Sequence, residues 1–389
     1  MQSRAPFLLA VLALTGCSTK SATTADASVP RLDASLTDAS PPPPTDAAVD
    51  SPPDASPAPP DASGPWLSDT LVQDGSGLVV EDVVYRSGAL KVHARICRPL
   101  DGVAHPVLLL NHGGFVGLLD ADRLFCENAA RAGYVVLASS YRGEDGSGGK
   151  VEVCQGEIDD VRALLAIALT LPYAEANEIV AWGQNHGGCV TSKLAVLQPS
   201  LLRAEALFFA PYDWAALDQY WNAQIAQGEP VPFCQVQEGG TSWCLPLHQA
   251  FIQEVEGALG GTSSQVPSAY ASRSPASIAG QIATPTMLFQ GTYDPVVTPD
   301  QACAFRAAWT SSGKSVLSWY QDANLVVQTP SAVCGGNWQA SSLPDPANPQ
   351  AWAAASFYLF VYEQQGDGFF GNADMQSQQM GLAFLTSRL

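Results

Sequence analysis

A strand–turn–helix pattern places an asparagine where its motif calls for a nucleophile. The apolar run Ile179–Trp182 is followed by residues 183–187, which read Gly-Gln-Asn-His-Gly, and a helical pattern begins at Gly187. When serine occupies the centre of such a G-x-S-x-G turn, a histidine activates its hydroxyl for attack on a carbonyl carbon. An asparagine amide has no ionisable hydroxyl or thiol, so Asn185 cannot form an acyl-enzyme.

A second turn could still bind the oxygen that such an attack creates. Residues 111–115 read Asn-His-Gly-Gly-Phe and follow the apolar run Val107–Leu110. The backbone N–H groups of Gly113, Gly114 and Phe115 would lie beside the N-terminus of the helix that begins near His186. Such a place favours a carbonyl oxygen or an anion even without a nucleophile. We therefore expect Gly113, Gly114, Phe115, Asn185 and His186 to bind a small carbonyl or carboxylate ligand, or a peptide, noncovalently.

Several segments, in this order and spacing, resemble one known family. Beside the two turns, they are 140–149 (Ser-Tyr-Arg-Gly-Glu-Asp-Gly-Ser-Gly-Gly), 157–161 (Glu-Ile-Asp-Asp-Val) and 284–297, which ends in Gly-Thr-Tyr-Asp-Pro-Val-Val. Together they cover roughly residues 80–325 and resemble the prolyl oligopeptidase-type catalytic domain of the α/β-hydrolase superfamily. Dienelactone-hydrolase-like esterases share most of the pattern. The resemblance implies hydrolysis of peptide or ester bonds.

The resemblance also implies a catalytic triad in the chain order nucleophile, acid, histidine. Asp294 fits the acid. The histidine should follow the last strand in a segment similar to Tyr-x-x-Ala-Gly-His, but residues 320–325 read Tyr-Gln-Asp-Ala-Asn-Leu and place Leu325 there. The histidines are His93, His105, His112, His186 and His248, so none follows Asp294.

With both the nucleophile and the histidine base substituted, no triad is intact, and we expect a binding protein without normal serine-hydrolase activity. An active esterase or peptidase with a non-standard arrangement is the alternative, and a structural protein with a closed pocket is a third possibility. Cys189, one helical turn after Asn185, is expected to face the sheet or form a disulfide rather than act as a nucleophile.

The elements that must position these residues alternate between strand and helix. After a pair of strands at Val79–Tyr85 and Leu90–Cys97, apolar runs at 107–110, 134–139, 179–182, 206–210, 287–290 and 316–320 predict strands. Between or after them, helical patterns cover 121–132, 158–169, 187–197, 300–309 and 350–363. This alternation predicts an α/β-hydrolase fold over 66–389, with a mostly parallel, doubly wound sheet. Residues 211–280 interrupt it, and we expect them to form a cap whose aromatic side chains line a pocket or pack the cap's own core.

The N-terminal residues are typical of export. Arg4 precedes the short apolar stretch Pro6–Leu14, and Leu14-Thr-Gly-Cys17 resembles the lipoprotein box of bacteria, which implies cleavage before Cys17 and lipidation of its thiol. Ser18 favours the outer membrane over inner-membrane retention. Residues 18–65 contain Asp-Ala-Ser five times and four successive prolines, a composition that predicts a disordered tether. We expect the lipid to be the protein's only contact with the membrane.

Eight cysteines follow Cys17, and an even number in an exported chain suggests disulfides. We expect Cys234–Cys244, Cys126–Cys154 and Cys303–Cys334, which leaves Cys97–Cys189. The histidines and cysteines show no metal-ligand spacing, so we expect neither a metal nor another cofactor. The net charge of −19 argues against nucleic acid as a partner. We expect a monomer.

Overall fold

Apolar runs of five to seven residues become central strands because helices cover both of their faces. The computed structural model describes residues 66–75, 77–228, 232–236, 242–330, 333–335, 337–365 and 371–389. The expected signal peptide (1–17) and tether (18–65) lie outside these residues. No helix in the described part of the chain is long and apolar enough to cross a membrane.

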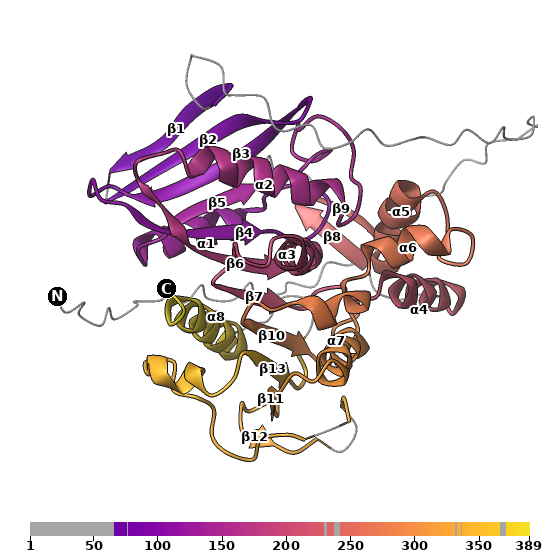
Figure 1. The fold of residues 1–389 in the computed structure, drawn as a ribbon. Coiled ribbons are helices and arrows are strands. Elements are labelled where there is room, and N and C mark those ends of the chain that lie inside the picture. Colours follow the sequence, from indigo (N-terminus) through magenta and orange to yellow (C-terminus); the bar gives the residue numbers. More distant parts are fainter. Residues whose placement is uncertain are drawn as a thin grey trace, which may run out of the picture. The chain divides into compact units, whose positions relative to one another are not determined.

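One large sheet runs through the molecule (Figure 1), and its strand order is β1-β2-β3-β5-β4-β6-β7-β10-β13-β11-β12. The strands are β1 Ser68–Gly75, β2 Leu78–Ser87, β3 Leu90–Pro99, β4 His105–Asn111, β5 Val135–Ser139, β6 Ala174–Gln184, β7 Ala204–Phe208, β10 Thr286–Gly291, β11 Val316–Gln321, β12 Val327–Gln328 and β13 Phe357–Tyr362. From β5 to β11 every neighbouring pair is parallel, whereas β1, β2, β3 and β12 join antiparallel. The prediction of a mostly parallel sheet is confirmed.

Helices cover both faces of this sheet and bury two separate cores. The helices are α1 Asp120–Arg131, α2 Gly156–Ala168, α3 His186–Leu197, α7 Pro299–Ser311 and α8 Gly371–Thr386. Cys126 of α1 and Phe384 of α8 pack in one core, and helices α2, α3 and α7 pack in the other. Along β4, Leu108 enters the first core and Leu109 the second, because successive side chains of a strand alternate between faces. The predicted doubly wound fold is confirmed.

The predicted helix over 350–363 is wrong. A short 3-10 helix, η3 Pro349–Ala353, precedes β13, and β13 lies between β10 and β11. All six residues of β13 are buried, as expected for a strand covered on both faces. A short, continuously apolar run does not distinguish a buried strand from a buried helix. Strands β1 and β12, at the two edges of the sheet, also escaped prediction.

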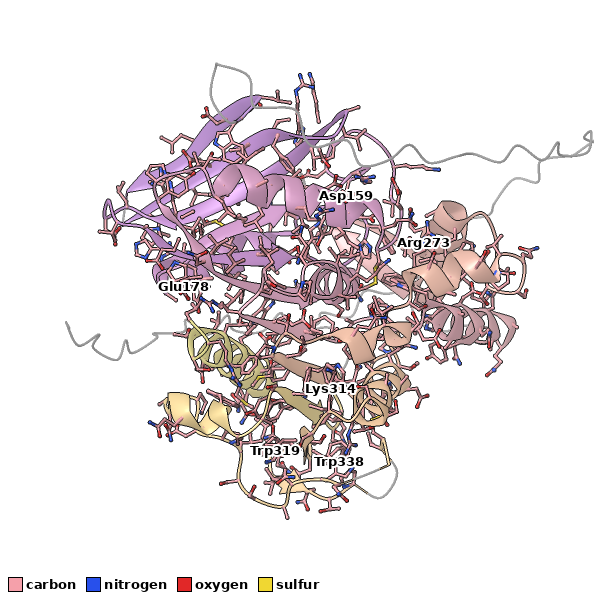
Figure 2. All side chains as sticks on the ribbon, viewed as in Figure 1. Asp159, Glu178, Arg273, Lys314, Trp319 and Trp338 are labelled. Atoms are coloured by element: carbon pink, nitrogen blue, oxygen red, sulfur yellow. A yellow bond between two sulfur atoms is a disulfide. The ribbon has the colours of Figure 1, made fainter. Side chains whose placement is uncertain are left out.

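Between β7 and β10 the chain forms an insertion that occupies the stretch expected to be a cap. It contains α4 Trp214–Ala226, the hairpin β8 Pro232–Val236 and β9 Ser242–Pro246, α5 Leu247–Leu259, α6 Pro267–Arg273, η1 Pro275–Ser277 and η2 Ala279–Gln281. Trp221 of α4 stacks on Phe251 of α5 with ring centroids 5.8 Å apart. Both rings belong to the core that α2, α3 and α7 bury against the sheet. Arg273, labelled in Figure 2, donates its Nε–H to the Glu152 carbonyl at 3.0 Å and ties α6 to the loop that precedes α2.

The structure corrects two of the expected disulfides. It contains Cys97–Cys126, Cys154–Cys189 and Cys303–Cys334. The predictions of Cys126–Cys154 and Cys97–Cys189 are wrong because α1 packs Cys126 against β3, whereas α3 carries Cys189 on the other face beside residue 154. The prediction of Cys303–Cys334 is confirmed.

The fourth expected disulfide, Cys234–Cys244, concerns side chains that lie outside the described residues. The backbone register of β8 and β9 pairs position 234 with position 244, so this disulfide remains a prediction.

Candidate active site

The turn between β6 and α3 has the backbone of a nucleophile elbow. Asn185 adopts φ 48° and ψ −124°, a conformation that is strained for a residue with a side chain. Close packing requires glycine on the helix side of the turn, because a Cβ at Gly187 would lie 2.0 Å from the Asn111 carbonyl oxygen. The turn projects the Asn185 side chain from the carboxyl end of β6, where parallel sheets place their ligand sites.

The amide oxygen of Asn185 occupies the oxyanion position itself. Its Oδ1 accepts the His186 N–H at 2.7 Å, and the Gly114 N–H approaches the same atom at 3.5 Å. These two backbone groups are the donors that the sequence predicts for a substrate oxygen. Gly113 allows the approach, because a Cβ at this position would lie 2.7 Å from Asn185 Cβ. The structure therefore brings Gly113, Gly114, Asn185 and His186 together.

The two histidines near the elbow are neutral structural groups. Burial lowers the pKa of His186 to about 3, and its Nε2 accepts the Cys154 N–H at 3.0 Å. Burial also lowers the pKa of His112, whose Nδ1 bonds the Gly113 carbonyl at 2.9 Å. His112 stacks on Tyr141 with centroids 4.3 Å apart. His112 thus braces its own loop, and His186 has no role as a base at neutral pH.

Phe115 joins the oxyanion loop to the insertion. Its ring lies 4.8 Å from the His186 ring and 6.5 Å from the ring of Phe251 on α5. On its other side, His186 faces Trp214 of α4 at 6.3 Å. Aromatic side chains of the insertion thus pack directly against the loop and the elbow that frame Asn185.

The loop that follows β5 carries ion pairs and contacts the chain directly after the oxyanion turn. Arg142 binds Asp160 through Nε at 3.0 Å and Nη2 at 2.9 Å, and its Nη1 pairs with Glu152 at 2.6 Å. In the same loop, Glu144 accepts the Gly117 N–H at 2.7 Å, and burial raises the pKa of its carboxyl well above the usual range. Glu144 thus holds the backbone at Gly117, directly after the oxyanion turn.

Asp294 lies at the carboxyl end of β10, as its triad position requires. Its Oδ1 accepts the N–H groups of Val296 at 2.9 Å and Val297 at 2.7 Å. A histidine that sequence reasoning dismissed lies beside this turn, since His248 of α5 places its Nε2 2.6 Å from the Pro295 carbonyl. Its place in the chain gave no signal, because His248 precedes Asp294 and belongs to the insertion.

Leu325 does not lie where the sequence placed it. It follows β11, which is separated from β10 by β13. Thr292 donates its N–H to the Tyr362 carbonyl at 2.9 Å, and the Tyr293 N–H bonds the Gln365 carbonyl at 2.9 Å. The chain that leaves β13 therefore passes beside the Asp294 turn, whereas Leu325 follows a strand that lies one place farther along the sheet.

Residues 366–370, which continue from β13, read Gly-Asp-Gly-Phe-Phe and lie outside the described residues. They contain no histidine, so the lack of a histidine downstream of Asp294 holds for either position. Within the described residues, no group of three His, Cys, Asp or Glu side chains could hold a metal ion.

Known proteins similar to this chain include peptidases, an esterase and a quorum-quenching protein. Residues 87–231 match the family model of the X-Pro dipeptidyl-peptidases (S15 family). The quorum-quenching protein AidA of Acinetobacter baumannii (strain MDR-ZJ06) is 30% identical over 112 residues, which cover 28% of this chain and 36% of AidA.

Two solved structures share the fold. A candidate dipeptidyl aminopeptidase IV from Bacteroides ovatus superposes with a TM-score of 0.56 at 14% identity, covering 81% of this chain and 37% of its own. Acetyl xylan esterase 1 from Thermoanaerobacterium superposes with a TM-score of 0.50 at 14% identity, covering 81% of this chain and 88% of the esterase. The match thus spans little more than a third of AidA and of the Bacteroides protein. Together with the S15 match over residues 87–231 and the strand order, these structures show that this chain has the α/β-hydrolase fold.

Proposed function

We propose that this protein is an exported α/β-hydrolase homologue that binds a ligand noncovalently and lacks serine-hydrolase activity. The observation that carries the proposal is the position of Asn185 Oδ1 between the His186 and Gly114 N–H groups. A hydrolase needs these donors for the oxygen of its tetrahedral intermediate. Here the protein's own amide satisfies them, at the position that a nucleophile would occupy.

The ligand class follows from the backbone that surrounds Asn185. The loop at residues 113–115 and the N-terminus of α3 present backbone N–H groups at this edge of the sheet, and a helix N-terminus favours an oxygen or an anion. Carbonyl and carboxylate oxygens complement such donors, so the proposed ligand is a small molecule or peptide that carries one of them. Attachment through a lipidated Cys17 would place this site outside the cytoplasm.

An isosteric substitution tests the binding proposal. Asn185→Asp keeps an oxygen for the two backbone donors but replaces the amide NH2 by a second acceptor with negative charge. Blocked dipeptides, with either a free carboxylate or an amide end, are titrated into the full-length protein by calorimetry. We expect the wild type to bind a member of this panel and Asn185→Asp to bind it at least about tenfold more weakly. Equal affinity in the two proteins would contradict a ligand site at Asn185.

One observation favours a second candidate, a hydrolase with a non-standard arrangement. His248 approaches the Asp294–Pro295 turn at 2.6 Å and comes from the insertion rather than from the end of the chain. If this arrangement catalyses hydrolysis, His248→Gln should abolish turnover of p-nitrophenyl acetate by the wild type. Turnover that is equal in wild type, His248→Gln and Asn185→Ala excludes this candidate.

A further inference from the structure

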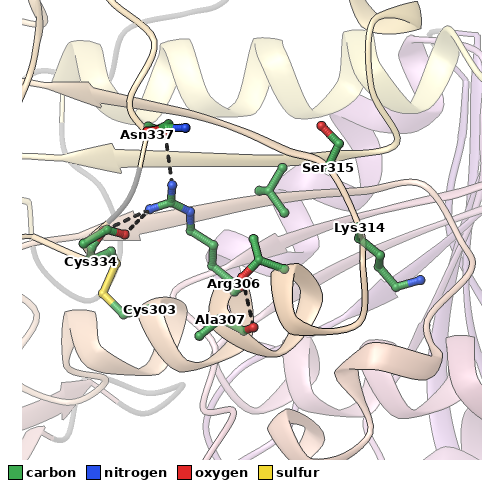
Figure 3. A pocket seen from close by; sticks show the side chains of 10 residues that line it. Cys303, Arg306, Ala307, Lys314, Ser315, Cys334 and Asn337 are labelled. Carbon is green, nitrogen blue, oxygen red and sulfur yellow. Dashed lines mark hydrogen bonds between the residues drawn. A yellow bond between two sulfur atoms is a disulfide. The ribbon is translucent and has the colours of Figure 1, made fainter.

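A cavity of about 670 Å³ lies beside α7. Its walls include Cys303, Arg306 and Ala307 of α7, Lys314 and Val316 at the start of β11, and Cys334 (Figure 3). Strand β11 is separated from β6, which leads into Asn185, by β7, β10 and β13. The cavity and the elbow are therefore different sites, and nothing in the triad argument accounts for the cavity.

A buried positive charge forms part of the cavity wall. Arg306 is 7% exposed. Its Nη1 donates to the carbonyls of Cys334 at 2.9 Å and Gly335 at 3.0 Å, and its Nη2 donates to the Asn337 carbonyl at 3.1 Å. These partners are neutral, and no carboxylate of the described residues pairs with Arg306. A buried cation without an opposite charge is costly, so an anion in the cavity would be stabilised.

Two other arginines of this protein bind a carboxylate through Nε and Nη2, and they illustrate how the same two nitrogens of Arg306 would bind an anion. Arg95 holds both oxygens of Asp82 through Nε at 2.7 Å and Nη2 at 2.9 Å. Arg142 holds Asp160 through the same two nitrogens. In Arg306 the loop carbonyls take only Nη1 and one bond from Nη2, and no described residue accepts from Nε. The Nε and Nη2 edge, through which Arg95 and Arg142 each bind a carboxylate, thus retains N–H donors in Arg306.

The rest of the wall combines aliphatic and neutral polar groups. Ala307 and Val316 contribute aliphatic carbons, Thr310 and Ser315 contribute hydroxyls, and the disulfide Cys303–Cys334 fixes the loop that holds the guanidinium. Lys314 extends away from Arg306 in Figure 3, and its Nζ lies 4.9 Å from the centre of the Phe357 ring. A ligand at Arg306 therefore meets one guanidinium edge beside small neutral groups, which matches a single small carboxylate better than a polyanion.

We propose that this cavity binds a small organic monocarboxylate. Its two oxygens accept from the Nε and Nη2 edge of Arg306, and its hydrocarbon part lies against Ala307 and Val316. The site would act independently of Asn185. Because the whole chain carries a net charge of −19, an anion is expected to bind only where a local cation such as Arg306 offsets that charge.

Calorimetric titration of the full-length protein with benzoate and propionate, at constant ionic strength set with chloride, tests the site. We expect saturable one-to-one binding of one of them with a Kd of about 1 mM or tighter. Ala307→Phe adds a bulky ring at a position that lines the cavity and keeps Arg306, so it should weaken binding at least about tenfold. Arg306→Gln removes the charge and should abolish binding.

Matched controls separate this site from others. Arg131→Gln removes an exposed arginine that pairs only on its own helix, with Glu127 at 3.3 Å and Asn128 at 3.3 Å, and should leave binding unchanged. Loss of binding in Ala307→Phe assigns it to this cavity rather than to Asn185, because β7, β10 and β13 separate β11 from β6. The proposal is overturned if the wild type shows no saturable binding, or if Ala307→Phe binds as the wild type does. Ala307→Phe decides the outcome even where Arg306→Gln fails to fold.

Discussion

Asn185 keeps the backbone of a nucleophile position while its side chain satisfies the groups that would receive a reaction intermediate. The strained φ of 48° persists without a serine to present. Such strain normally survives because the surrounding structure enforces it. Here the close packing of Gly113 against Asn185 and the bond to the His186 N–H enforce it together. The geometry of the elbow is thus separable from its chemistry.

Restoring the serine should not restore catalysis. Asn185→Ser supplies a hydroxyl, but a serine hydrolase that lacks its histidine base loses about 10⁶ in turnover. Adding Leu325→His, which the sequence alone would suggest, should not help, because β13 separates the end of β11 from the Asp294 turn. We expect p-nitrophenyl acetate turnover of both variants to stay within about tenfold of the wild type. A larger gain in the double variant would contradict the placement of Leu325.

A buried carboxyl predicts a pH dependence of stability. Glu205 on β7 is fully buried, and burial raises its pKa from 4.5 to about 8, while the Thr286 hydroxyl donates to it at 2.9 Å. The folded state therefore binds a proton that the unfolded chain releases above pH 4.5. The associated stability is fully present below pH 4.5 and is lost as the pH rises to about 8.

Glu205→Gln removes this dependence while keeping the shape of the side chain. We expect it to raise the free energy of unfolding by about 1–3 kcal/mol at pH 8. At pH 4 the gain should disappear, because the glutamate is then neutral in both states. Thermal melts of the two proteins across this pH range check the expectation. A constant difference at all pH values would show that Glu205 does not titrate between the two states.

Among the elements, β13 separates the end of β11 from the Asp294 turn at the end of β10. Its six residues are buried between β10 and β11, and the turn that follows contacts the Asp294 turn. Leu359→Ala should destabilise the protein by about 2–5 kcal/mol, because it leaves a cavity in a core covered on both faces. Leu197→Ala, at a position that is 60% exposed, should change stability by no more than about 0.5 kcal/mol. Denaturant unfolding of the two variants compares them, and similar losses would contradict a central β13.

The sequence predicts elements best where a period and a boundary agree. The glycines after Trp182 mark the start of α3 to within a residue, and strands β4, β5, β7 and β10 lie within about two residues of the predicted runs, whereas β6 begins five residues before its predicted run. Residues 357–362 lack such a signal, because six successive apolar side chains satisfy a buried strand and a buried helix equally. Because these residues are not recognised as a strand, the sequence alone assigns Leu325, which follows β11, to the third triad position.

Other features of the site depend on contacts that no local pattern contains. The placement of His248 beside Pro295 depends on the packing of the insertion. The pairing of Cys97 with Cys126, and of Cys154 with Cys189, depends on which face each helix covers. Helix order predicts that both faces are covered, but it does not assign one helix to each cysteine. The direction of the Asn185 amide likewise emerges only once the loop at Gly114 has been placed.

For the whole molecule, the sequence predicts attachment to a membrane through lipid alone. Labelled palmitate supplied to a bacterial host should enter the wild-type protein, and Cys17→Ser should abolish incorporation, because the thiol is the expected attachment point. The remaining cysteines provide the control, since six of them are joined in disulfides. Label that persists in Cys17→Ser would contradict a lipidated Cys17.

The fold of the whole molecule is shared with hydrolases that act on peptide and ester bonds. We propose that this chain, unlike them, has no activated nucleophile. Treatment of the full-length protein with a fluorophosphonate probe, followed by intact mass measurement, tests it most directly. We expect an unshifted mass, because an amide at position 185 does not attack phosphorus and no histidine follows Asp294. A stoichiometric adduct would contradict the account, and mapping the labelled peptide would identify the nucleophile.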